Sequence, residues 1–132
     1  MDKVAEMLTK IRNAQMAERA DLEVGFSKLK FALAEILKKE GFIGDVFQFG
    51  DKIKKIKIIL KYNQLSRTKK VSAIRGIRKI SKSGQRIYVK SKDIKNVKNK
   101  YGKAIFSTSK GVMTGENSRK AGLGGEYLCE VW

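Results

Sequence analysis

Three consecutive hydroxyl side chains are the strongest candidates for binding chemistry in this sequence. Ser107, Thr108 and Ser109 follow a mainly apolar segment and precede Lys110 and Gly111. Hydroxyl groups donate and accept hydrogen bonds, so a rigid loop of them can bind ribose hydroxyls, base edges and phosphates. Lys110 can neutralise a phosphate, and Gly111 lets the main chain approach a ligand closely. The alternative is a strand-end turn closed by local serine and threonine hydrogen bonds, and these residues alone favour neither.

A second candidate group combines closely spaced glycines with a carboxylate. It consists of Gly122, Gly124, Gly125 and Glu126. Such glycines either bring the main chain against a ligand or form a turn between a helix and a strand. Glu126 either accepts a hydrogen bond from a base amine or forms a structural ion pair, and the ion pair is the more common arrangement.

Tyr88 is the third candidate, because two cations share its side of an expected strand. Arg86, Tyr88 and Lys90 alternate with Ile87 and Val89, so the two sets face opposite sides. An aromatic ring among cations can stack on a base or a sugar. The alternative is a tyrosine of the hydrophobic core.

The charge of the chain favours a polyanionic partner. Thirty basic and 13 acidic side chains give a net charge of +17. Residues 1–66 hold 13 basic and 9 acidic side chains, whereas residues 67–132 hold 17 basic and 4 acidic ones. A single charge run is usually a solvated surface, but an imbalance spread over a whole half favours nucleic-acid binding.

Catalytic and metal-binding chemistry has few candidates. The chain has no histidine, and Cys129 is its only cysteine, which excludes an internal disulfide, zinc sites of the Cys/His type and histidine-dependent catalysis. The four acidic residues of the second half, at positions 93, 116, 126 and 130, form no evident metal cage, and no nucleotide-binding glycine motif is present. We therefore expect no catalytic residue, metal, cofactor or small-molecule substrate. A lone cysteine is typical of a reducing compartment and of a small buried side chain.

The first half, residues 1–66, has the pattern of two helices on a small antiparallel sheet. Apolar residues at helical spacing predict a helix over 3–16, and Ser27 is a suitable N-cap for a second helix that Gly41 would end. Alternating apolar residues predict strands over 43–49 and 53–61, joined by a turn at Gly50 and Asp51. This half is therefore expected to be an α+β unit.

The second half, residues 67–132, reads as mainly β with short helices. Residues 63–70 are polar and are the best linker candidate. Strands are expected over 71–77, 85–90, 104–108 and 126–131, with a turn at 82–84 and helical turns near 92–98 and 115–121. Because a unit of about 65 residues is marginally stable alone, the two halves should pack against each other.

Membrane and export signals are not expected. The longest apolar run has four residues, 31–34, far below a membrane span. Asp2 and Glu6 lie within the first helical pattern, which is atypical of a secretory signal. The sequence thus indicates a cytoplasmic protein without a membrane partner.

Motifs along nearly the whole chain resemble a known family, the bacterial small-subunit ribosomal protein S-eight family. The similar segments are 7–14 (MLTKIRNA), 27–30 (SKLK), 37–43 (LKKEGFI), 74–81 (IRGIRKIS), 86–88 (RIY), 106–114 (FSTSKGVMT), 119–129 (RKAGLGGEYLC) and the terminal 131–132 (VW). Two departures are the absence of the family's Asp-Pro near the N-terminus and a Lys82-Ser83-Gly84 turn where the family usually has Lys-Pro-Gly.

The resemblance implies a two-part α+β protein that binds a helical segment in the central domain of small-subunit ribosomal RNA. It also implies early binding during assembly, neighbouring ribosomal proteins as partners, and, in some members, repression through the protein's own messenger RNA. Carried onto this sequence, it implies a recognition loop and surrounding contacts at Ser107, Thr108, Ser109, Lys110, Tyr88, Gly124, Gly125 and Glu126, with further contacts at Ser27 and Lys30.

Two other functions compete with this hypothesis. Composition alone would suit an architectural DNA-binding protein, but hydroxyl contacts to ribose favour RNA. An RNA-modifying enzyme would need an acid, histidine or cysteine arranged for catalysis, and the sequence shows no such arrangement.

Overall fold

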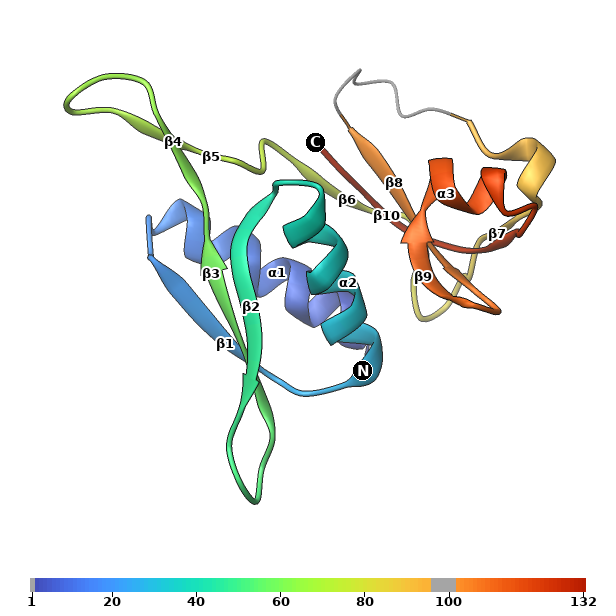
Figure 1. The fold of residues 1–132 in the computed structure, drawn as a ribbon, viewed down its shortest axis with the longest axis horizontal. Helices are drawn as coiled ribbons and strands as arrows, with labels where there is room; N and C mark the ends of the chain where they lie inside the picture. The colour runs from blue at the N-terminus through green and yellow to red at the C-terminus, as the bar shows by residue number, and fades with distance from the viewer. Residues whose placement is uncertain (1, 96–101) are drawn as a thin grey trace.

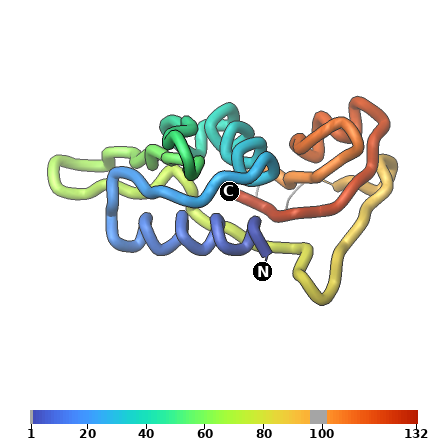
Figure 2. The backbone as a smooth tube through the Cα atoms, turned by 90° about the horizontal axis from the view of Figure 1, so that it is seen from below, coloured from blue at the N-terminus to red at the C-terminus, as the bar shows by residue number. Residues whose placement is uncertain are grey.

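The structure is a computed structural model that describes residues 2–95 and 102–132, and it confirms the α+β fold class (Figure 1). The two halves lie side by side along the long axis, and α1 begins near the middle of that axis (Figure 2). The elements in chain order are α1 (Lys3–Met16), β1 (Asp21–Gly25), α2 (Lys28–Lys39), β2 (Ile43–Phe49), β3 (Lys55–Leu60), β4 (Tyr62–Gln64), β5 (Lys70–Ser72), β6 (Ile77–Lys79), β7 (Tyr88–Val89), the 3₁₀ turn η1 (Ser91–Asp93), β8 (Lys103–Thr108), β9 (Gly111–Thr114), α3 (Gly115–Lys120) and β10 (Gly125–Val131).

The two long helices begin and end where their capping residues predict. Asp2 caps α1 by accepting hydrogen bonds from the amides of Val4 and Ala5. Ser27 caps α2 by accepting one from the amide of Lys30 at 3.1 Å. After α2, Gly41 adopts a φ of 84°, a conformation that suits glycine and ends the helix. The helices bury their apolar faces, as the spacing of those residues predicts.

The first half contains a three-stranded antiparallel sheet in the order β1-β3-β2, one strand more than the two expected. Its additional strand is β1, in which Leu22 and Val24 are buried between exposed or half-buried neighbours. This alternation spans only five residues between two strong helical patterns, so it is easily missed. Strand β3 is shorter than expected because Ile53 lies outside it and is 74% exposed.

The expected linker segment over 63–70 is not an irregular connection but part of a β-hairpin between β3 and β6. Strands β4 and β5 pair antiparallel, with Asn63 opposite Val71. The hairpin extends from the first half, away from the second (Figure 1). Its polar composition reflects exposure on both sides of a two-stranded ribbon.

The second half is built on an antiparallel sheet in the order β6-β10-β8-β9, and β7 also pairs with β10. The expected strands over 71–77 and 85–90 are too long, since only short segments of them pair with neighbours. The strand β9 was not expected, whereas the helix near 115–121 is confirmed as α3 and is followed by Gly122 at a φ of 70°. Of the expected turn near 92–98, the described part is η1, and residues 96–98 lie outside the described residues.

The two halves share a hydrophobic core, as their small size predicts. Residues of α1, α2 and the first sheet form one buried cluster with Ile77, Ile105 and Val131 of the second sheet. Helix α2 also packs against β9, and Arg12 on α1 donates a hydrogen bond of 2.6 Å to the carbonyl of Ile77. These contacts place the second sheet firmly against the helices of the first half.

No helix in the described residues is long and apolar enough to cross a membrane.

Candidate nucleic-acid interface

Three predicted site residues lie in one row across three neighbouring strands. On β10, Glu126 pairs with Tyr88 of β7 on one side and with Ser107 of β8 on the other. Directly paired residues in antiparallel strands point to the same face of the sheet. The structure therefore brings Tyr88, Glu126 and Ser107 together, although they come from segments far apart in the sequence.

The three hydroxyls of the Ser-Thr-Ser segment have different surroundings. The hydroxyl of Thr108 donates to the carbonyl of Gly111 at 2.7 Å and accepts from the amide of Lys110 at 3.2 Å, so it closes the turn between β8 and β9. Gly111 has a φ of 113°, which explains why a glycine follows this turn. Within residues 2–95 and 102–132, the hydroxyls of Ser107 and Ser109 form no hydrogen bond. Ser109 and Lys110 are exposed at the tip of the hairpin.

Tyr88 is exposed rather than buried in the core, with 72% of its surface accessible. Arg86 and Lys90 are exposed as well, while Ile87 and Val89 are half-buried, which confirms the expected alternation. Beside the ring is a shallow hollow of about 480 Å³, lined by Tyr88, Val89, Lys90, Ser91, Gly124 and Gly125. An exposed ring next to a hollow and between two cations is suited to stacking on a base.

Gly124 and Gly125 allow β10 to lie close to its neighbouring strands. A side chain at Gly124 would overlap the carbonyl of Val89, and one at Gly125 would overlap the carbonyl of Ser107. Their first role is therefore close backbone packing within the protein. On the opposite face of the same strands, the rings of Phe106 and Tyr127 stack with centroids 4.6 Å apart.

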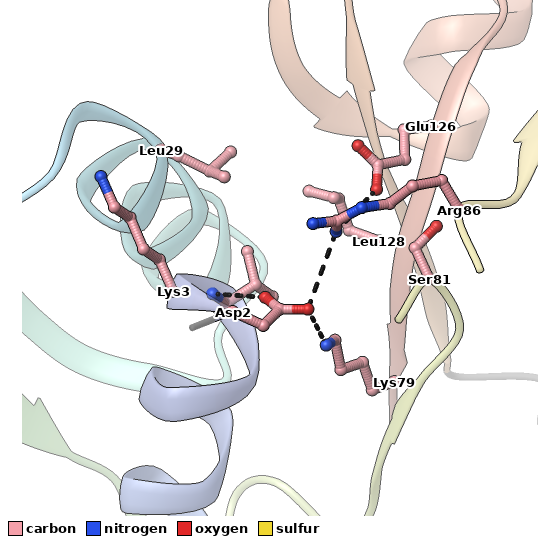
Figure 3. Close-up of a pocket in the computed structure, with 9 residues that line it drawn as sticks. Asp2, Lys3, Leu29, Lys79, Ser81, Arg86, Glu126 and Leu128 are labelled. Carbon is pink, nitrogen blue, oxygen red and sulfur yellow. Dashed lines mark hydrogen bonds and ion pairs between the residues drawn. The ribbon is translucent and has the colours of Figure 1, made fainter. Parts of the chain in front are cut away.

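Glu126 forms an ion pair, the more common of its two predicted arrangements. Its carboxylate lies 3.3 Å from the guanidinium of Arg86, and its side chain is 20% exposed. Arg86 also lies 3.7 Å from the carboxylate of Asp2, which in turn contacts the ammonium group of Lys79 (Figure 3). The four charged side chains line a cavity of about 380 Å³ between the two halves.

Asp2 and Lys79 were not among the predicted site residues. The N-cap position of Asp2 before a helical pattern was a readable signal, but its contact with Lys79 joins residues 77 positions apart. Burial by itself would raise the pKa of Asp2. The hydrogen bond from Lys79, the amides of Ala5 and Val4 and the charge of Lys79 outweigh it and hold that pKa below its usual value.

Ser27 and Lys30 belong to the first half and lie outside the row formed by β7, β10 and β8. Ser27 is half-buried and uses its hydroxyl to cap α2. Lys30 is only 5% exposed, and its ammonium nitrogen lies near Gly25. Much of the Lys30 stem is thus covered by protein, so contact with a partner would be limited to its end.

Comparison with known proteins agrees with this arrangement of motifs. A family model described as Ribosomal protein S8 matches residues 2–132. The chain belongs to this family. Among its relatives named small ribosomal subunit protein uS8, that of Sorangium cellulosum is 46% identical over 132 residues, covering 99% of this chain and 98% of the relative. The relative from Caldanaerobacter subterraneus is 47% identical, over 99% of this chain and 97% of the relative. The relative from Oleidesulfovibrio alaskensis is 48% identical, over 99% of this chain and 98% of the relative.

This S8 family member keeps its single cysteine in the core. Cys129 on β10 is fully buried, and burial, together with the charge of Glu130, raises the pKa of its thiol to about 12. Among the described residues, no group of three or more His, Cys, Asp or Glu side chains is placed to hold a metal ion.

Proposed function

We propose that this chain is a structural constituent of the small ribosomal subunit that binds ribosomal RNA through the second half of its fold. The observation that carries the proposal is the row formed by Tyr88, Glu126 and Ser107, which continues to the exposed hairpin tip at Ser109 and Lys110. It combines an exposed ring, unused hydroxyls and a cation on a half whose net charge is strongly positive.

Each residue has a role in this proposal that its surroundings support. Tyr88 stacks on an unpaired base beside the adjacent hollow, and Ser107 and Ser109 bond to sugar hydroxyls or base edges. Lys110 contacts a phosphate. Thr108, Gly124 and Gly125 hold the backbone in place, and Glu126 accepts hydrogen bonds from a base while Arg86 fixes its position. Ser27 and Lys30 are proposed as further contacts from the first half on the family resemblance alone, because the Ser27 hydroxyl already caps α2 and Lys30 is only 5% exposed.

The RNA target that we propose is a helical segment in the central domain of 16S ribosomal RNA. In a regular RNA helix the major groove is too deep and narrow for side chains to read, and the shallow minor groove is recognised mostly by its shape. Sequence-specific binding therefore favours a distortion that exposes a base. The exposed ring of Tyr88 suits such a distorted site. In the cytoplasmic ribosome, neighbouring ribosomal proteins would be further partners of the chain. A similar site in its own messenger RNA would allow the protein to repress its own translation.

A footprint of the purified chain on total ribosomal RNA tests the proposal. We expect protection of one segment in the central domain of the small-subunit RNA, and competition by that segment but not by random RNA of equal length. Uniform protection, or a preference for duplex DNA of the same length, would instead support the architectural DNA-binding alternative. Cosedimentation with small subunits in a sucrose gradient tests the assembled state.

A further inference from the structure

We infer that Asp2 is a positioning residue for the RNA site, acting through Arg86 on Glu126; this inference rests on the proposed function. Asp2 lies in the first half, directly before α1, whereas Glu126 lies on β10 within the row of candidate contacts. The link between them runs through the guanidinium of Arg86 (Figure 3). The first half thus helps to orient a side chain that the second half presents to RNA.

The two oxygens of Asp2 have separate tasks. Oδ1 accepts hydrogen bonds from the amides of Val4 and Ala5, at 3.0 and 3.2 Å, which fixes the carboxylate at the start of the helix. Oδ2 points toward the second half, where it contacts the ammonium group of Lys79 and lies 3.7 Å from Nη1 of Arg86. Because the helix cap holds one oxygen, the other is a fixed negative charge at the boundary between the halves.

Arg86 links the Asp2 carboxylate to the RNA site. The same nitrogen, Nη1, lies 3.3 Å from Oε2 of Glu126, so one guanidinium contacts both carboxylates. The side chains of Asp2 and Glu126 are only 11% and 20% exposed, and partly buried charges interact more strongly than solvated ones. Without Asp2, the half-exposed guanidinium would be free to adopt other rotamers and would hold Glu126 less firmly.

The charge balance of the cluster supports a positioning role over simple attraction of RNA. Asp2 and Glu126 offset Lys79 and Arg86, so the cluster as a whole carries no net charge in a strongly basic half. An acidic residue beside an RNA site repels phosphates, and this cost is offset when the residue fixes the geometry of a neighbour. The opposite role would be competition, in which Asp2 withholds Arg86 from RNA phosphates.

The variant Asp2→Asn separates these roles because asparagine remains a good helix N-cap while the negative charge is lost. Its matched control is Asp21→Asn, which removes the same charge from β1, where Asp21 lies 3.8 Å from Lys57. The wild type, these two variants, Glu126→Gln and the Asp2→Asn/Glu126→Gln double variant are titrated at fixed salt with the central-domain fragment of 16S RNA and with random RNA of equal length. Thermal melts of the five free proteins accompany the titrations.

Relative to Asp21→Asn, we expect Asp2→Asn to weaken binding to the fragment by about three- to tenfold and to leave random RNA unchanged. The double variant should bind the fragment no more weakly than Glu126→Gln alone, because both changes break the same link. Losses that simply add in the double variant would overturn the positioning role, and tighter binding than the control would show competition for Arg86. If the wild type shows no preference for the fragment, the proposed function itself is refuted. If the wild type prefers the fragment but the losses of the two variants add, only the positioning role of Asp2 is refuted.

Discussion

The guanidinium of Arg86 lies 3.3 Å from the carboxylate of Glu126, and Glu126 is paired in register with Ser107 on the neighbouring strand. An ion pair and a candidate RNA contact therefore share one side chain. The two interpretations of Glu126 that the sequence leaves open are compatible in this geometry. They still predict different effects when its charge is removed.

Glu126→Gln removes the charge and keeps the shape of the side chain. If Glu126 organises the RNA site, binding to the central-domain RNA fragment should weaken while the melting temperature barely moves, since a partly exposed ion pair contributes ~0–1 kcal/mol. The measurement is affinity for the fragment and for random RNA at fixed salt, beside a thermal melt. Improved affinity for the fragment would mean that Glu126 is only a repulsive surface charge, and a large fall in melting temperature would make it structural.

Ser109→Ala and Thr108→Val should separate recognition from turn formation. Ser109 has an exposed hydroxyl without a partner in the described part of the chain, so Ser109→Ala should leave folding and random-RNA binding intact. It should weaken binding to the fragment by roughly 1–3 kcal/mol, because a buried group on the RNA loses its partner. Thr108→Val should instead lower the free energy of unfolding by about 1 kcal/mol, because the turn loses two hydrogen bonds. Equal losses of Ser109→Ala on both RNAs would contradict the recognition role.

The helices were predictable because their signals are local. A cap such as Ser27 and the apolar residues that follow it lie within a few turns of one another, and so does the ending glycine Gly41. Strand β1 was missed because it is short and its partner β3 lies far along the chain. Strand β9 was missed because its four residues, which follow the turn that Thr108 closes, show no clear alternation of buried and exposed side chains. A short polar ribbon such as β4 and β5 has the composition of a linker.

The candidate site was predictable by residue type but not by arrangement. Hydroxyls, an aromatic ring among cations and a carboxylate after glycines can each be read along the chain. Their alignment depends on the register of β10 with β7 and β8, which no local pattern specifies. The link from Asp2 to Arg86 depends on how the two halves pack, so periodicity could not indicate it.

Binding to the RNA fragment should depend steeply on salt because the second half is strongly basic. If about 6–10 phosphates are neutralised, affinity should fall ~10³–10⁵-fold between about 50 and 200 mM salt. Lys82 and Lys92 are exposed, so each can contact a phosphate. Lys82→Ala or Lys92→Ala should then weaken binding to all RNAs similarly. Each should also lower the slope of log affinity against log salt concentration by about one unit. A titration that is flat with salt would contradict the electrostatic part of the proposal.

Gly125→Ala should destabilise the fold, because the added methyl group would overlap the carbonyl of Ser107 on β8. Forcing the two strands apart should lower the free energy of unfolding by ~1–3 kcal/mol, measured by urea denaturation. Gly84→Ala is the matched control, since a methyl group there meets no heavy atom of the described chain within 4 Å. If both variants were equally stable, close packing would not be the reason for the glycine at position 125.

The stability that Asp2 contributes should depend on pH. Its folded-state pKa is lowered below the ordinary value of 3.8, so the stabilisation is fully present above that value and is lost as the pH falls through the folded-state pKa. Wild type should therefore be more stable than Asp2→Asn near pH 6, and the gap should close as the pH falls below about 4, where the carboxylate becomes protonated. Urea denaturation of both proteins at a series of pH values measures the gap, and comparing the pair cancels the contribution of Asp45, whose pKa is also lowered. A gap that stays constant down to pH 2 would show that Asp2 stabilises the fold only as a neutral helix cap.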